Sequence, residues 1–126
     1  MARKSRKIPS GGGYADIDSC ADVLPRCLAG DPDAREAFVL RTRGLIRWAL
    51  VVTFRRYGRP LGDGDLEDFG QEVLLALFHD DARKLRQYEG RNGASLATWL
   101  RVVVIRFAID RIRKLSSGAI LESPQA

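Results

Sequence analysis

The sequence predicts an all-α protein, a single compact bundle of four to five helices. Long stretches of the 126-residue chain carry apolar residues at helical spacing, most clearly 33–57, 65–78 and 95–115. Glycine- and proline-containing segments separate these stretches, as loops between helices do. The apolar run Val102-Val103-Val104-Ile105 has strand propensity, but it lies within a pattern of helical length and period. These observations favour helices packed around one core.

The chain divides into three parts. Residues 1–18 form a basic, glycine-rich tail that we expect to be disordered, because it has too little apolar surface to pack. Residues 19–115 carry all of the helical patterning and are expected to form one domain. Residues 116–126 are expected to be a polar tail or the start of an interdomain linker.

Capping signals mark the start and end of the first long helix. A short helix over 19–28, disturbed by Pro25, precedes it. Asp31 is expected to be its N-cap, with Pro32 in the first turn, and Gly58 to end it. Its expected apolar stripe is Ala34, Ala37, Phe38, Leu45, Trp48, Ala49 and Val52.

An acidic helix follows, in a segment between Arg59 and Arg83 that contains no Lys or Arg although the chain has a net charge of +5. Its expected core stripe is Leu66, Phe69, Val73 and Leu77, with Glu67, Asp68, Gln71 and Glu72 on the other side. Asp65 is expected to be the N-cap, with Asp68 completing a capping box. Acids in a first turn are explained by the helix dipole, but Gln71 and Glu72 lie beyond it. They indicate either a solvated face or a partner-binding face. A shorter helix is expected over 81–88.

The last helix combines cations with a tryptophan. Ser95 or a neighbour is expected to cap it; Ile105, Ala108, Ile109, Ile112 and Leu115 mark one face, and Arg106, Asp110, Arg113 and Lys114 the opposite one. The cations are suited to phosphates, and Trp99 to stacking on an unpaired base. Alternatively, Asp110 forms salt bridges at helical spacing and Trp99 belongs to the core.

Catalytic chemistry finds no support in the residue types. The chain has one histidine, His79, and contains neither a glycine-rich phosphate loop nor a nucleophile elbow. We therefore expect no enzyme activity, no metal site and no cofactor. No stretch approaches the ~20 apolar residues of a membrane span, and no secretory signal is evident, so a cytoplasmic protein without membrane contact is expected.

Four blocks of the sequence, in order, resemble region 2 of bacterial RNA polymerase sigma factors of the extracytoplasmic-function type. They are Ala29-Gly30-Asp31 with Ala34-Arg35-Glu36-Ala37-Phe38; Asp65-Leu66-Glu67-Asp68-Phe69-Gly70-Gln71-Glu72-Val73; Ser95-Leu96-Ala97-Thr98-Trp99-Leu100; and Ala108-Ile109-Asp110-Arg111-Ile112-Arg113-Lys114. The resemblance covers roughly residues 26–115.

The resemblance implies two sets of site residues and a role in transcription initiation. Docking on the β′ clamp of core RNA polymerase would fall on Asp68, Gln71, Glu72 and Leu75. Contact with the non-template strand of the promoter −10 element would fall on Arg91, Asn92, Ser95, Trp99 and Arg106, and the pattern of the last helix adds Arg113 and Lys114. An anti-sigma factor is a further partner that the resemblance implies.

The chain departs from the family pattern at two positions and in one larger feature. Arg106 stands where the family usually has asparagine, and Ile105 where a basic residue is frequent. Nothing after Leu115 is expected to form the second, −35-reading domain. The second interpretation is therefore a sigma-like interaction module that binds polymerase or an anti-sigma partner without promoter-specific readout.

Overall fold

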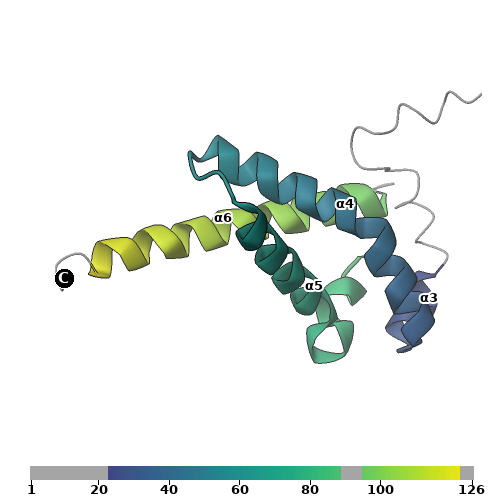
Figure 1. Ribbon diagram of the computed structural model, residues 1–126. Helices are drawn as coiled ribbons and strands as arrows, with labels where there is room; N and C mark the ends of the chain where they lie inside the picture. The colour runs from purple at the N-terminus through teal and green to yellow at the C-terminus, as the bar shows by residue number, and fades with distance from the viewer. Residues whose placement is uncertain (1–22, 89–94, 123–126) are drawn as a thin grey trace, which may run out of the picture.

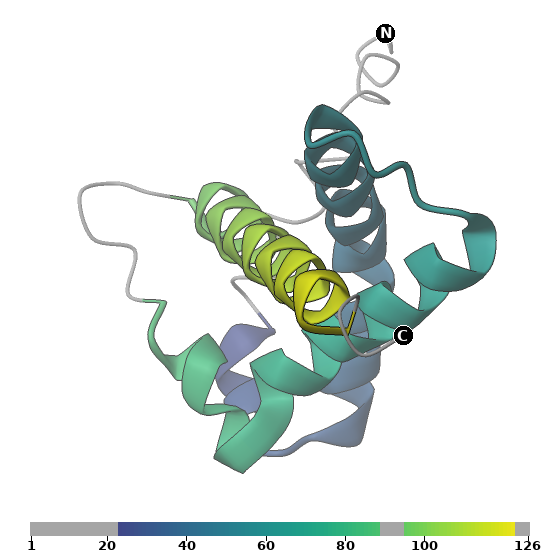
Figure 2. The same ribbon diagram turned by 90° about the vertical axis from the view of Figure 1, so that its left-hand side faces the viewer.

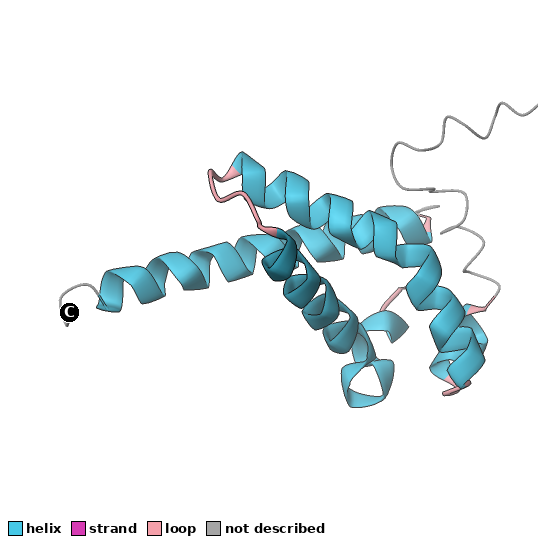
Figure 3. Ribbon diagram, viewed as in Figure 1, coloured by secondary structure: helices cyan, strands magenta, loops and turns pink. Residues whose placement is uncertain are grey.

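The computed structural model describes residues 23–88 and 95–122, which form four helices and no strand (Figure 3). The helices are α3 (Leu24–Leu28), α4 (Pro32–Arg56), α5 (Asp63–Arg86) and α6 (Leu96–Glu122). The predicted all-α bundle is confirmed. The predicted tail over 1–18 and the first residues of the predicted helix 19–28 lie outside the described residues.

Helix α4 is the centre of the bundle, because it packs against each of the other three helices. Figures 1 and 2 show α5 and α6 on different flanks of α4, with the short α3 beside the first turns of α4. Figure 1 also shows that the C-terminal part of α6 extends past the other helices. The flanks of α4 and α6 therefore carry surface that no further helix of the described chain covers.

The start and end of α4 follow the predicted local chemistry. The Asp31 side chain accepts a hydrogen bond from the backbone N–H of Asp33 at 3.0 Å, and Pro32 is the first helical residue. A hydrogen bond from the Arg26 side chain, helped by the backbone N–H of Asp33, holds the pKa of Asp31 below its ordinary value of 3.8. After the helix, Gly58 adopts a φ of 73°, which favours glycine.

The core face of α4 differs from the predicted stripe. Its buried residues are Ala34, Phe38, Thr42, Leu45, Ile46, Ala49, Leu50, Thr53 and Phe54. Trp48 and Val52, which were predicted to be core, lie at the edge of the buried face, and Trp48 is 39% exposed. Helices α5 and α6 pack on different flanks of α4 and together bury a broad face of it. A single stripe of apolar residues does not predict where the centre of that buried face lies.

Helix α5 starts earlier than predicted. Its first residue is Asp63, and Gly62 occupies the N-cap position without a side-chain hydrogen bond. The predicted capping box of Asp65 and Asp68 is therefore wrong, because both residues lie inside the helix. The predicted core stripe holds: Leu66, Val73 and Leu77 are buried and Phe69 is partly buried.

A kink separates the regular part of α5 from its last turn, where a break between two helices was predicted. His79 is extended, and Asp80, Asp81 and Ala82 have left-handed φ values of 57°, 58° and 58°. Such a conformation costs roughly 1–2 kcal/mol per residue and needs support from its surroundings. Arg86 supplies support by donating to the Asp81 carbonyl at 2.8 Å and to the Leu28 carbonyl at 2.6 Å.

Helix α6 begins as predicted but ends later. Ser95 Oγ accepts a hydrogen bond from the backbone N–H of Thr98 at 3.1 Å, which confirms the predicted cap. The buried stripe is Leu96, Leu100, Val104, Ala108 and Ile112, a row at four-residue spacing. The predicted end at Leu115 is wrong: the helix continues to Glu122, and Leu115 is 43% exposed.

Candidate functional site

Helix α5 presents a ridge of exposed side chains opposite its buried stripe. Asp68, Gln71 and Leu75 are exposed, and their spacing places them on one face. Leu75 is 70% exposed, the largest fraction among the large apolar side chains that the structure describes. These three residues, the α5 ridge, are three of the four predicted docking residues.

Two glutamates lie on the flanks of α5 and pair with neighbouring helices. Glu67 Oε1 is 3.0 Å from Arg47 Nη1 on α4, and Glu72 Oε1 is 2.5 Å from Arg111 Nη2 on α6. Glu72, the fourth predicted docking residue, therefore faces α6 rather than sharing the α5 ridge. Two of the acidic residues of α5 thus connect this helix to α4 and to α6.

Arg111 is also held by aromatic rings. Its guanidinium carbon lies 5.3 Å from the centroid of the Phe69 ring and 5.2 Å from that of Phe107. Cation–π contacts of this kind add to the ion pair with Glu72. The arginine thus joins α5 and α6 through charge and through packing.

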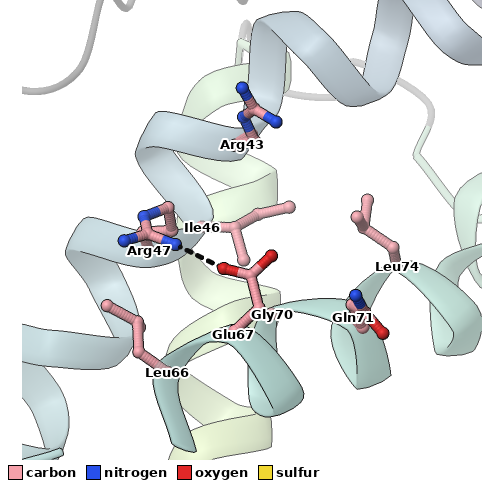
Figure 4. A pocket seen from close by; sticks show the side chains of 8 residues that line it. All are labelled: Arg43, Ile46, Arg47, Leu66, Glu67, Gly70, Gln71 and Leu74. Atoms are coloured by element: carbon pink, nitrogen blue, oxygen red, sulfur yellow. Dashed lines mark hydrogen bonds and ion pairs between the residues drawn. The ribbon is translucent and has the colours of Figure 1, made fainter. Parts of the chain in front are cut away.

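A small hollow of about 40 Å³ opens between α4 and α5 beside the ridge (Figure 4). Its lining is Arg43, Ile46, Arg47, Leu66, Glu67, Gly70, Gln71 and Leu74. A methyl group on Gly70 would meet no atom within 4 Å, so no packing within the described chain requires glycine there. The hollow is open space that an incoming side chain can occupy.

The surface along α6 is of a different kind. A groove of about 350 Å³ lies between α5 and α6, which we call the α5–α6 groove. It is lined by Val73, Ala76, Leu77, Lys84, Gln87, Trp99, Val102, Val103, Arg106 and Phe107. None of these lining residues carries a carboxylate. The groove therefore combines aromatic and apolar walls with cations.

Two of the predicted nucleic-acid residues meet in this groove. Trp99 is partly buried and packs on Tyr88, with ring centroids 5.7 Å apart at an interplanar angle of 55°. Trp99 was predicted to be either a core residue or an exposed stacking residue. In the structure its burial is intermediate, and part of its indole lines the groove. Arg106 lines the same groove and is exposed.

The other predicted nucleic-acid residues are not brought together in the same way. Ser95 is engaged as the helix cap, and Lys114 Nζ lies 3.5 Å from the Asp110 carboxylate, as the salt-bridge alternative predicts. Arg113 is exposed farther along α6. Arg91 and Asn92 lie outside the described residues.

A second groove, of about 280 Å³, lies on the opposite flank of α6, which we call the α4–α6 groove. It is lined by Trp48, Val52, Thr53, Arg56, Tyr57, Arg101, Val102, Ile105 and Ile109. Again, none of these described residues is acidic. Sequence reasoning missed this groove because it placed Trp48 and Val52 in the core. The available signal was the run Arg55-Arg56-Tyr57, two arginines followed by an aromatic residue at the end of the helix that carries Trp48.

The cations in the two grooves share one property. The side chains of Lys84 and Arg106 in the first groove, and of Arg56 and Arg101 in the second, make no ion pair or hydrogen bond within the described part of the chain. Arg47, Arg86 and Arg111, by contrast, pair with carboxylates. No carboxylate of the described residues therefore neutralises the groove cations.

The chain was compared with known protein families, curated proteins and solved structures. No known protein family, curated protein or solved structure matches the chain. Among the described residues, no helix is long and apolar enough to cross a membrane, and no three His, Cys, Asp or Glu side chains are grouped to hold a metal ion.

Proposed function

We propose that this chain acts as a sigma-factor region 2 domain, which docks on core RNA polymerase through the α5 ridge and holds a single strand of promoter DNA against α6. The observation that carries the proposal is the α5–α6 groove, where Trp99 lies beside Lys84 and Arg106. Within residues 23–88 and 95–122, neither cation has an ion-pair partner and none of the lining residues is acidic. The resemblance to sigma region 2 supplies the names of the partners.

The groove suits an unpaired nucleotide. A base can stack on the indole of Trp99, and stacking of this kind tolerates any base. Its phosphates can approach Arg106 and Lys84, which no carboxylate of the described lining neutralises. Gln87 at the same groove supplies an amide with donors and an acceptor for a base edge.

Arg106 changes what is read at the position where the family usually has asparagine. A guanidinium carries only donors, so it cannot form the paired donor and acceptor contact that an amide makes to adenine. It binds phosphate oxygens, or the two acceptors of a guanine. Base preference at this position should therefore differ from that of the family pattern.

The α5 ridge suits a protein partner. An exposed leucine flanked by Gln71 and Asp68, beside an open hollow, offers apolar contact with polar groups at its rim. Leu75 is 70% exposed, so most of its side chain is open to a partner rather than packed in the described bundle.

The docking proposal is tested by retention of core RNA polymerase on the immobilised chain. We expect Leu75→Gln and Gln71→Ala to reduce retention without changing the helical content or the midpoint of unfolding. Glu72→Lys is a poor probe, because a lysine there would face Arg111 and weaken the bundle itself. Retention equal to that of the wild type in both ridge variants would rule out the ridge as the docking surface.

The second candidate is an interaction module that occupies polymerase or an anti-sigma partner without reading promoters. Arg106 favours it, because the residue that the family uses at this position is replaced. The two candidates differ in one measurement: a promoter-reading domain binds single-stranded oligonucleotides carrying a −10-like sequence more tightly than scrambled ones, whereas the interaction module does not discriminate.

A further inference from the structure

We infer that the α4–α6 groove is a second binding subsite for the same single strand of nucleic acid, which crosses α6 from one groove to the other. The inference rests on the nucleic-acid part of the proposed function and not on the docking part. It assigns roles to Trp48, Tyr57, Arg56 and Arg101, none of which the sequence analysis placed in a site.

The α4–α6 groove contains two exposed aromatic rings. Trp48 is 39% exposed and Tyr57 is 50% exposed, and both line the α4–α6 groove. The exposed part of each ring is open to a group that enters the groove. Two half-exposed rings in one groove provide faces on which bases stack, with ~1–3 kcal/mol per stacked base as the general range.

The groove also carries positive charge. Arg56 and Arg101 line it from α4 and from α6, and neither side chain makes an ion pair or hydrogen bond within the described chain. None of the described lining residues is acidic. The charge therefore complements a polyanion, and its combination with aromatic faces is that of a single-strand site.

The α4–α6 groove is continuous with the α5–α6 groove. Val102 lines both grooves and is itself 39% exposed, so the two meet over the outer surface of α6. A helix with its side chains is about 10 Å across, so the grooves on its two flanks are separated by about that distance. One strand can therefore place different nucleotides in each groove while its backbone crosses near Arg106.

The chain carries two tryptophans, one in each groove, which provides a separate reporter for each subsite. Trp48→Phe leaves only Trp99, and Trp99→Phe leaves only Trp48, with an aromatic ring retained at each position. The probe is an oligodeoxythymidylate long enough to span both grooves. We expect the tryptophan fluorescence of both variants to be quenched with the same midpoint, and an abasic oligomer of equal length to bind more weakly with little quenching.

The cations provide the matched variants. Arg56→Gln with Arg101→Gln should abolish quenching of Trp48 but not of Trp99. It should also lower the slope of log affinity against log salt by about 1.4, since each phosphate contact to a single strand contributes about 0.7. Arg43→Gln is the control: this arginine lies on the same helix, lines the hollow on the other side and has no ion pair within the described chain. Its slope should equal that of the wild type.

The possible outcomes separate this inference from the function on which it rests. Quenching of Trp99 alone overturns the second subsite and leaves the proposed nucleic-acid function in place. Quenching of Trp48 alone overturns the inference too, because no strand then crosses from the first groove, and quenching of neither overturns both the inference and the proposed nucleic-acid function. A Trp48 signal with an acidic peptide such as oligoglutamate, and none with the oligonucleotide, overturns the inference in favour of a protein ligand.

Discussion

Helix α5 and the outer surface of α6 carry opposite charges, and the structure uses those charges differently. On α5, Glu67 and Glu72 are paired with arginines of α4 and α6. Along α6, the cations of both grooves have no partner within the described residues. The acidic helix is thus partly a structural element, whereas the basic grooves have charge available for a ligand.

The difference shows that charge along a sequence does not by itself identify a binding face. The acids of α5 recur at helical spacing, which indicated one docking surface. In the structure they point in different directions: Asp68 lies on the α5 ridge, whereas Glu67 and Glu72 lie on the two flanks. What remains on the ridge is one carboxylate, Asp68, with Gln71 and Leu75. Docking there should depend on shape and apolar contact more than on charge.

The largest expected effect is the response of oligonucleotide binding to salt. With about four phosphate contacts, a single-strand slope of about 0.7 per contact predicts a roughly 50-fold loss of affinity between 50 mM and 200 mM salt. Binding to core polymerase through the α5 ridge should change much less over that range. Fluorescence titration at several salt concentrations measures the affinity for the oligonucleotide. Retention of polymerase on the immobilised chain, at the same salt concentrations, measures docking. A loss below about fivefold for the oligonucleotide would contradict the role given to the unpaired cations.

The next effect concerns the pairs on the two flanks of α5. Arg111→Leu should lower the free energy of unfolding by about 1–2 kcal/mol, because it removes an ion pair with a partly buried Glu72 and two ring contacts. Arg47→Leu is the matched change at the more exposed Glu67 pair and should cost about 0.5 kcal/mol or less. Urea unfolding of both variants measures the difference. Equal losses would mean that the aromatic rings add nothing to the Arg111 pair.

A smaller effect tests the hollow beside the ridge. Gly70→Ala should raise the free energy of unfolding by about 0.5–1 kcal/mol, since alanine is the better helix former and its methyl group meets no atom within 4 Å. The same methyl group should reduce polymerase retention if a partner side chain enters the hollow. Gly64→Ala provides the control on the same helix, with similar stabilisation and unchanged retention. A more stable Gly70→Ala protein that retains polymerase fully would exclude the hollow from the interface.

The smallest effect belongs to the acid at the start of α4. The pKa of Asp31 is lower in the folded protein than its ordinary value, so its carboxylate stabilises the fold above that ordinary value. This contribution is lost as pH falls through the lowered pKa. Asp31→Asn should therefore flatten the acid side of the stability profile and leave oligonucleotide binding near neutral pH unchanged. Thermal unfolding from pH 2 to pH 6 measures the effect.

Sequence patterns predicted the helices well and the surfaces in part. The Asp31 and Ser95 caps, the core stripe of α5 and the break after it follow from local chemistry that a sequence displays. The burial of α4 does not, because two helices cover it from different flanks and shift Trp48 to the edge of the core. The end of α6 was placed too early because Ser116-Ser117-Gly118 interrupts the apolar pattern after Leu115, whereas the helix continues to Glu122.

The sequence likewise predicted some of the site residues and missed those that only helix packing brings together. Trp99 and Arg106 were predicted from residue type, and the structure brings them into one groove. The role of Glu72 in pairing with Arg111 was not predicted, because the two residues are far apart in the chain. Lys84, Gln87, Arg56 and Arg101 were missed for a similar reason: each belongs to a groove only through helix packing.

The most direct test of the account compares a paired arginine with an unpaired one. The measurement is the slope of log oligonucleotide affinity against log salt for Arg106→Gln and for Arg47→Gln. We expect Arg106→Gln to lower this slope by about 0.7 and to leave the free energy of unfolding unchanged. We expect Arg47→Gln to leave the slope at the wild-type value. Equal slopes for the two variants would contradict the account, because pairing within the bundle would then have no bearing on which cations meet the ligand.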